Sequence, residues 1–173
     1  MWYVRTVEEI FSKYRTRDGG GIYIGMASNT QNIGAGYETA ATPDGRNSGA
    51  ALSAASSPTY GCDVCGPTAT FKSMSKPDYS RVALGSVLNQ KYSPAMFTNP
   101  DNRRKLLLAI KTYFLLGGQE VQINSISRDI LKDAMEHPEE HRNLGVRVSG
   151  FSGYYVCLPR EVQVDILNRT EQG

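Results

Sequence analysis

Cysteine and histidine are scarce in this sequence of 173 residues, which has three of the former and two of the latter. An odd number of cysteines without a secretory context does not predict a disulfide framework. Cys62 and Cys65 have the spacing of a redox or metal pair, but a structural zinc site needs four ligands and no second pair is present. His137 and His141 are separated by Pro138, which disrupts the helix that would align them. We therefore expect no metal site and no bound cofactor, and two ordinary buried thiols at positions 62 and 65.

The chain also lacks a strong net charge and a long apolar run. Its net charge is +2, which does not predict binding to nucleic acid or to an anionic membrane surface. The longest strongly apolar run, residues 106–116, is interrupted by Lys111 and is too short to span a bilayer. Residues 1–5 lack the charged-then-apolar layout of a signal peptide. The composition is that of a soluble globular protein, so we expect a single cytoplasmic domain over residues 1–173.

Hydrophobic periodicity predicts an α/β fold with short elements. Helices are expected over residues 4–14, 102–116, 128–136 and 160–169. Strands are expected over residues 22–26, 120–126 and 154–158, with an extended segment over 84–94. The apolar face of the second helix is predicted to consist of Leu106, Leu107, Ile110, Tyr113 and Phe114. Polar and apolar residues alternate over 120–126, which is typical of a strand with one face in the core.

Residues 28–67 are rich in small and polar residues and contain few large apolar ones. Composition alone would indicate a disordered linker. However, so long a structureless loop is uncommon in a compact domain unless it is functional. The turn sequence TPDGR at 42–46 has a specific mechanism, since proline presets φ and glycine supplies the unusual φ that follows. We expect the surface of a partner to order this region, because it cannot bury itself.

Two glycines three residues apart, Gly150 and Gly153, stand between an apolar segment and an aromatic pair. Glycine has no Cβ, so its backbone reaches conformations closed to other residues. It can also lose a hydrogen from Cα and leave a carbon radical that flattens fully, because no side chain clashes with the flanking peptides. The amide nitrogen on one side donates into such a radical, and the carbonyl on the other side withdraws from it. A plain Gly-Ser turn remains the alternative for this loop.

The order of short motifs along the chain resembles the C-terminal region of glycyl radical enzymes of the dehydratase, lyase and decarboxylase branch. The motifs are ATPDGR (41–46), SP (57–58), GPTA (66–69), LNQKYSP (88–94), YF (113–114), GGQEVQIN (117–124), LKDA (131–134), HPEE (137–140), VRVSGFS (146–152), EVQ (161–163) and NRTE (168–171). They cover most of the chain in the order of the family. The likeness is stronger than that to the formate-lyase branch or to the anaerobic ribonucleotide reductases.

The resemblance implies that the radical resides on Gly150. The radical loop around it would consist of Arg147, Val148, Ser149, Phe151 and Ser152. A separate activating enzyme that uses S-adenosylmethionine and an iron–sulfur cluster would remove one hydrogen from Gly150. The fold implied is the C-terminal portion of the family's α/β barrel, with short strands and helices and a glycine loop, completed by a partner chain.

The sequence departs from the family in length and in its cysteines. Family members are several times longer, and their N-terminal part carries the cysteine that becomes a thiyl radical. Cys62, Cys65 and Cys157 do not occupy that position, so none inherits the role. Gly153 stands where alanine is common and Phe151 where tyrosine is common, and both changes are mild.

Three hypotheses for the function remain open. The first is the small subunit of a split glycyl radical enzyme, which passes the radical from Gly150 to a cysteine on a larger partner chain. The second is a spare part that replaces the C-terminus of an oxygen-damaged full-length enzyme. The third is a non-catalytic binding or structural protein in which the glycine loop is only a turn. The dehydratase-like motifs favour the first.

Overall fold

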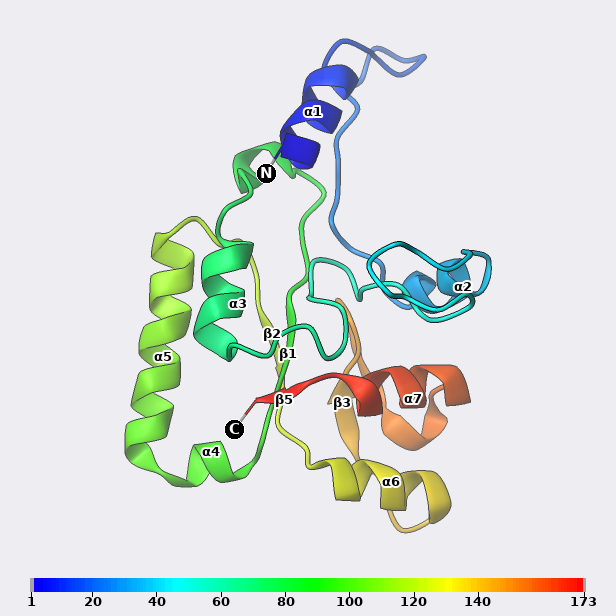
Figure 1. Cartoon of the computed structure of the whole chain (residues 1–173), viewed down its shortest axis with the longest axis vertical. Coiled ribbons are helices and arrows are strands. Elements are labelled where there is room, and N and C mark those ends of the chain that lie inside the picture. Colours follow the sequence, from blue (N-terminus) through cyan, green and yellow to red (C-terminus); the bar gives the residue numbers. More distant parts are fainter. Residues whose placement is uncertain (1, 173) are drawn as a thin grey trace.

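A three-stranded parallel sheet runs through the middle of the computed structural model, which describes residues 2–172 (Figure 1). The strand order is β2 (Gln122–Asn124), β1 (Asn89–Tyr92), β5 (Glu171–Gln172). Asn89 lies opposite Gln122, and Lys91 lies between Asn124 and Glu171. Within residues 2–172, β2 and β5 pair only with β1, so both edges of the sheet are open. With helices on its faces this is an α/β fold, as the sequence predicted.

Two helices, α3 (Pro67–Met74) and α5 (Pro100–Leu115), cover one face of the sheet (Figure 1). Apolar side chains from the helices and from β1 form a core cluster there, consisting of Phe71, Leu88, Tyr92, Leu106 and Tyr113. The side chain of Asn99 accepts a hydrogen bond from the amide of Asp101 at 2.9 Å, and Pro100 follows this cap, so α5 begins two residues earlier than expected. The short helix α4 (Ala95–Thr98) precedes it.

The predicted apolar face of α5 was only partly right. Leu106 and Tyr113 are buried, but Leu107 is 66% and Phe114 45% exposed. The helix contacts the rest of the described chain along one narrow stripe. Successive residues of a helix are about 100° apart around its axis, so the neighbours of the buried residues point outward. Leu108, Leu115 and Leu116 are exposed as well, which leaves a row of large apolar side chains uncovered.

A second core lies on the other side of the sheet, between helices α6 (Arg128–Glu136) and α7 (Arg160–Asn168) and a hairpin (Figure 1). The hairpin consists of β3 (Gly145–Arg147) and β4 (Ser152–Tyr154), which pair antiparallel. The fully buried residues of this second core include Leu131, Val148, Tyr155 and Ile166. The Ser127 hydroxyl accepts from the amide of Ile130 and caps α6. Both helices were predicted correctly from their periodicity and end signals.

The strand predicted over residues 120–126 contains β2. The other two strand predictions, over 22–26 and 154–158, were wrong in whole or in part. Residues 22–26 make only an isolated bridge, in which Met26 pairs with Ser86, so no ladder forms. The segment 154–158 leaves the extended conformation after Tyr154 and continues as a 3₁₀ turn, η2 (Tyr155–Cys157). The reason is tertiary: the hydroxyl of Tyr155 donates to the carbonyl of Gln163 at 2.9 Å, while the side-chain amide of Gln163 donates back to the Tyr155 carbonyl. These bonds turn the chain toward α7. Of the extended segment 84–94, only β1 is a strand.

Residues 28–67 contain one helix that periodicity did not predict, α2 (Gln31–Tyr37), and are held largely by polar bonds. The guanidinium of Arg46 donates to four backbone carbonyls, those of Thr39, Ala40, Asn47 and Ala50. Asn32 is buried and donates to the carbonyl of Leu52 and to the carboxylate of Asp165. Hydrogen bonds therefore organise a segment that has too few apolar residues to form a core. Whether a partner also orders it remains a prediction.

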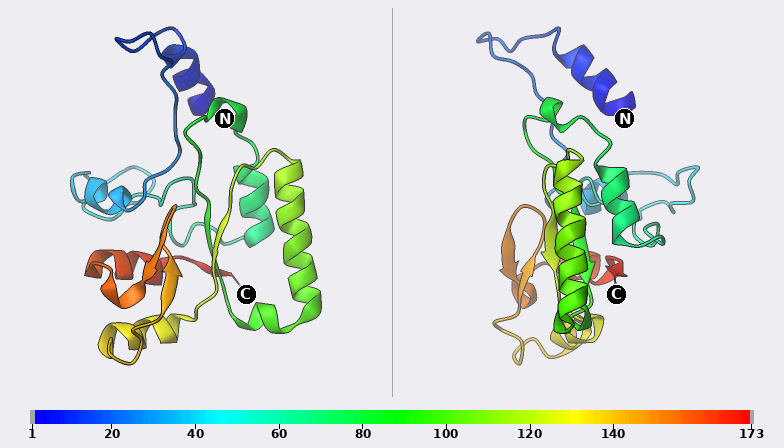
Figure 2. Two further views of the ribbon diagram at one scale, coloured as in Figure 1. Left: turned by 180° about the vertical axis from the view of Figure 1, so that it is seen from behind. Right: turned by 90° about the vertical axis from the view of Figure 1, so that its left-hand side faces the viewer.

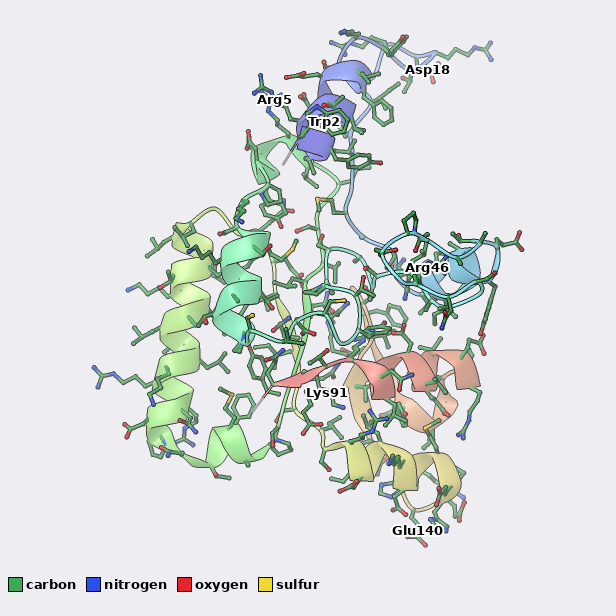
Figure 3. All side chains as sticks on the ribbon, in the orientation of Figure 1. Trp2, Arg5, Asp18, Arg46, Lys91 and Glu140 are labelled. Atoms are coloured by element: carbon green, nitrogen blue, oxygen red, sulfur yellow. The ribbon has the colours of Figure 1, made fainter. Side chains whose placement is uncertain are left out.

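The N-terminal helix α1 (Trp2–Phe11) projects from one end of the molecule, as the views from behind and from the side show (Figure 2). The helix ends at Phe11, three residues before Tyr14, the end predicted from the sequence. It packs on the short turn η1 (Tyr79–Arg81) through Val4. Arg81 pairs with Glu8 across this contact. Much of the apolar surface of α1 is uncovered: Trp2, which is labelled in Figure 3, is 78% exposed. Across residues 2–172, no helix combines the length and apolar character needed to cross a bilayer.

Candidate functional site

Gly150 lies at the tip of the β3–β4 hairpin. Its φ is +83°, in the left-handed region that favours glycine. The turn is closed by a hydrogen bond of 2.9 Å from the amide of Val148 to the carbonyl of Phe151. The structure therefore brings the predicted loop residues, Arg147 to Ser152, together in one tight turn between two paired strands.

The base and the tip of this loop differ sharply in exposure. Val148 and Ser149 are completely buried, whereas Gly150 and Ser152 are exposed and Phe151 is 43% exposed. The loop is thus anchored within the chain, and its tip with Gly150 faces outward.

The anchor is the polar face of the parallel sheet. The alternation of strands β1 and β2 places Leu88, Val121 and Ile123 toward the helices α3 and α5. The opposite face carries polar side chains that are also buried: Asn89, Lys91, Gln122 and Asn124. The sequence predicted one buried face for β2. The other face of β2, which is polar, is also buried, because the β3–β4 hairpin lies against it.

Two side chains of β2 hold the hairpin directly. The side-chain oxygen of Asn124 accepts from the amide of Arg147 at 2.8 Å, and its nitrogen donates to the Arg147 carbonyl at 2.6 Å. The oxygen Oε1 of Gln122 accepts from the amide of Gly150 at 3.1 Å and from Nε of Arg147 at 2.9 Å. From β1, Asn89 reaches the hydroxyl of Ser149 at 3.5 Å. Sequence reasoning did not name these residues, although the polar positions of the alternating pattern were the available signal.

Charged groups surround the base of the hairpin. Arg169 donates to a carboxylate oxygen of Asp165 at 3.1 Å and lies 3.4 Å from the Arg147 carbonyl. Asp165 also accepts from the hydroxyl of Tyr60, and burial together with this carboxylate raises the pKa of Tyr60 well above its usual range. Lys91, at the centre of the molecule (Figure 3), lies 3.3 Å from Glu171. Burial lowers the pKa of Lys91, and the carboxylate of Glu171 opposes that effect.

None of the three cysteines belongs to the loop around Gly150. All three are exposed, so the expectation of buried thiols at Cys62 and Cys65 was wrong. The reason is that the turn containing them has no apolar neighbour layer, and Val64 between them is also exposed. A side-chain carbon placed on Gly150 would meet one neighbouring atom within 4 Å beyond its flanking residues, Oδ1 of Asn29 at 3.5 Å. No cysteine sulfur lies within 4 Å of that position.

The histidines have a local structural contact. His137 and His141 both lie against the carboxylate of Asp133, at 2.9 and 2.6 Å. The pKa of His137 is raised by its hydrogen bond to Asp133. In the described chain, no three His, Cys, Asp or Glu side chains gather as a metal site would require.

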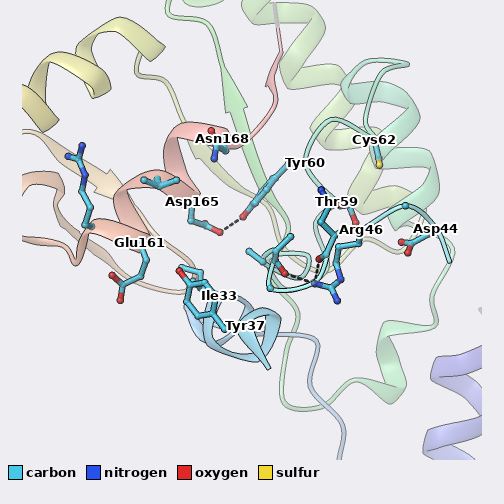
Figure 4. A pocket seen from close by; sticks show the side chains of 17 residues that line it. Ile33, Tyr37, Asp44, Arg46, Thr59, Tyr60, Cys62, Glu161, Asp165 and Asn168 are labelled. Carbon is cyan, nitrogen blue, oxygen red and sulfur yellow. Dashed lines mark hydrogen bonds between the residues drawn. The ribbon is translucent and has the colours of Figure 1, made fainter. Parts of the chain in front are cut away.

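A hollow of about 800 Å³ opens between α2, the 44–51 segment and α7 (Figure 4). Ile33, Tyr37, Arg46 and Asp165 are among its lining residues, and the bond between Tyr60 and Asp165 crosses one side of it. The lining does not include the residues of the glycine loop. The hollow is lined by residues of other motifs, Asp44, Arg46 and Glu161 among them, so the site predicted around Gly150 is the hairpin and its polar anchor and is separate from this hollow.

Comparison with known proteins identifies the family. The glycine radical family model matches residues 52–156. The probable dehydratase YbiW of Escherichia coli (strain K12) is 40% identical over 154 residues, which cover 88% of this chain and 19% of that protein. The trans-4-hydroxy-L-proline dehydratase of Clostridioides difficile is 32% identical, with 96% of this chain and 22% of that protein covered.

The fold agrees with solved members as well. The glycerol-bound form of the B12-independent glycerol dehydratase from Clostridium butyricum superposes with a TM-score of 0.92 at 38% identity, covering 95% of this chain and 21% of that one. The chain spans about a fifth of the length of the relatives that it matches. Since the family model covers more than half of the 173 residues, and since the likeness extends to the fold, the chain belongs to the glycyl radical enzyme family, with its dehydratases, lyases and decarboxylases.

Proposed function

We propose that this chain, as a single glycine radical domain, stores a radical on Gly150 and passes it to a cysteine on a larger partner chain. The reaction served is of the anaerobic radical lyase or dehydratase type, and the chain alone is inactive. In the first step one hydrogen atom moves from the Cα of Gly150 to a radical supplied by a separate activating enzyme that uses S-adenosylmethionine. In the second step Gly150 regains a hydrogen atom from the S–H group of the partner's cysteine, which leaves a thiyl radical there.

The observation that carries the proposal is the contrast within the glycine loop. A fixed base, held by Gln122 and Asn124, presents an exposed Gly150 at the tip of a hairpin. A turn that served only to connect two strands would not need a buried polar anchor, because burying polar groups costs free energy unless each finds a partner.

Three features support a larger partner. Both edges of the parallel sheet are open within residues 2–172, and such edges are normally paired or covered. Helix α5 leaves Leu107, Leu115 and Leu116 uncovered, and exposed apolar groups of this size are typical of interaction surfaces. An exposed carbon radical would also react with oxygen, so storage on Gly150 requires a cover that residues 2–172 do not supply.

The test is anaerobic activation. The chain is incubated with an activating enzyme and a larger chain that has a cysteine loop but no glycine loop, and the mixture is examined by electron paramagnetic resonance. We expect an organic doublet and turnover only when both chains are present. No doublet, under conditions that activate a full-length relative, would refute the radical role and leave the non-catalytic hypothesis.

The spare-part hypothesis is separated by a second arm of the same experiment. A full-length family member is first inactivated by air, which damages its own glycine loop, and the chain is then added with the activating enzyme. Recovery of activity in this arm, and none with the larger chain that lacks a glycine loop, would favour the spare part over the split enzyme.

A further inference from the structure

Gln122 makes the one side-chain hydrogen bond to the backbone of Gly150 that is present in residues 2–172. Its Oε1 accepts from the amide of Gly150 at 3.1 Å and from Nε of Arg147 at 2.9 Å. An amide oxygen has two lone pairs, so these two donors use its full capacity. Because one donor is a guanidinium, the oxygen is held by a charge-assisted bond and is fixed in direction. The nitrogen side of Gly150 is therefore set by a rigid, buried side chain.

The conformation of Gly150 does not suit a stabilised radical as it stands. A radical on Cα is stabilised by the neighbouring amide nitrogen only when its singly occupied orbital is parallel to the π system of that amide. This alignment requires φ near 180° or 0°. The observed φ of +83° is close to perpendicular, where the overlap nearly vanishes. Removal of the hydrogen must therefore be accompanied by rotation about the N–Cα bond of Gly150.

The surroundings decide which half of the loop turns. On the nitrogen side, Val148 and Ser149 are fully buried and Gln122 holds the amide. On the carbonyl side, Phe151 and Ser152 are exposed, and Phe151 lies outside the strand pairing that begins at Ser152 opposite Arg147, so the bond from the amide of Val148 is the one backbone hydrogen bond that holds Phe151 in the described chain. Rotation about N–Cα leaves the amide of Gly150 in place and moves Phe151.

Building on the radical role proposed above, we propose that Gln122 is a positioning residue for the radical: it fixes the amide plane of Gly150 while the Phe151 side of the loop rotates into that plane. The hydrogen bond also withdraws the amide hydrogen toward Oε1 and leaves the nitrogen a better donor to the radical. Gln122 thus selects one planar geometry from the many that an unanchored glycine could adopt.

The test compares three variants in the activated two-chain complex. Gln122→Met removes the acceptor at similar length, and Gln122→Glu keeps an acceptor and strengthens it. Asn124→Ala is the matched control, because it removes the two bonds to Arg147 on the same strand but leaves the acceptor for Gly150. The readout is the hyperfine coupling of the exchangeable amide hydrogen of Gly150, obtained by electron–nuclear double resonance in H₂O and D₂O.

We expect one well-defined coupling in the wild type and in Asn124→Ala. In Gln122→Met the coupling should shift and broaden, and the share of radical held on glycine should fall about tenfold, as for one lost hydrogen bond. In Gln122→Glu the coupling should shift in the opposite direction. If Gln122→Met does not fold, the shift in Gln122→Glu decides, since its carboxylate still pairs with Arg147.

The outcomes are distinguishable from those of the radical role itself. A wild-type doublet with couplings unchanged in both Gln122 variants would overturn the positioning role alone. An equal change in Asn124→Ala would also overturn it, because anchoring of the hairpin would then suffice. Absence of any wild-type doublet would overturn the radical role and this inference with it.

Discussion

Replacement of Gly150 by alanine should abolish the radical while leaving the fold nearly intact. A residue with a Cβ in the left-handed region costs about 1–2 kcal/mol, and the φ of +83° places Gly150 there. Alanine recovers about 0.4–1 kcal/mol, because it restricts the unfolded chain more than glycine does. No steric term is added, since the new Cβ would meet only Oδ1 of Asn29, at an ordinary contact distance of 3.5 Å. The net loss should be about 1 kcal/mol.

Urea denaturation followed by circular dichroism measures this loss. The midpoint should fall without a change in slope, because the surface exposed on unfolding is the same. For a chain of this length, about 1 kcal/mol corresponds to a fall of roughly 2–4 °C in melting temperature. The electron paramagnetic resonance doublet should disappear completely, since the methyl group crowds the planar radical.

Gly153→Ala provides the matched control in the same hairpin. Gly153 is not in the left-handed region, and a Cβ there would lie 3.4 Å from Cδ2 of Leu158, which is an ordinary contact. This variant should keep its stability, or gain up to about 1 kcal/mol, and retain the doublet. A loss above about 4 kcal/mol in Gly150→Ala, or a doublet that survives in it, would refute the reasoning.

Three further predictions concern other parts of the chain. Air exposure of the activated protein should cut the backbone at Gly150, which mass spectrometry would detect as two fragments; an intact chain would contradict the radical site. Arg46→Lys should accelerate amide exchange over residues 39–50, because an ammonium group cannot serve four carbonyls at once; unchanged exchange would show that other contacts hold the segment. The hydrogen bond to Asp133 raises the pKa of His137, so protonated His137 stabilises the end of α6. This stabilisation is fully present below about pH 6.5, the ordinary pKa of histidine, and is lost as the pH rises through the higher pKa of His137 in the folded protein. Nuclear magnetic resonance titration of His137, with Asp133→Asn as control, should show that shift, and a histidine that titrates at its ordinary value in both proteins would refute it.

Three helices, α5, α6 and α7, were predictable because their signals are local. Helices α5, α6 and α7 each combine apolar periodicity with a start signal, namely Asn99 with Pro100, Ser127 and Pro159. Where such signals compete with tertiary contacts, the prediction failed. Tyr155 has high strand propensity, yet its bonds with Gln163 turn the chain away from the sheet.

Only the residues next to Gly150 in the sequence could be predicted as part of the candidate site. The motif around Gly150 identified the loop itself, but the residues that hold it are about 25 positions earlier in the chain. Gln122 and Asn124 alternate with apolar residues, which is typical of a strand with one face in solvent. They are buried instead, because the hairpin packs on that face, and this packing is a long-range event that alternation cannot encode.

The proposed radical has two separate requirements: an anchor, which is the set of side chains that hold the hairpin, and a cover, which is the partner surface over Gly150. The two should respond differently to mutation. The anchor belongs to this chain: Gln122 and Asn124 are buried and bonded to the hairpin within residues 2–172. The cover does not, since Gly150 and Phe151 are exposed. Loss of the Gln122 acceptor should alter the shape of the radical spectrum with the partner bound, whereas Asn124→Ala should leave that shape unchanged. A change that only weakens partner binding, such as Leu107→Asp on the exposed row of α5, should leave the spectrum unaltered and shorten the lifetime of the radical in trace oxygen. A Leu107→Asp variant that changes the spectrum but not the lifetime would contradict this division.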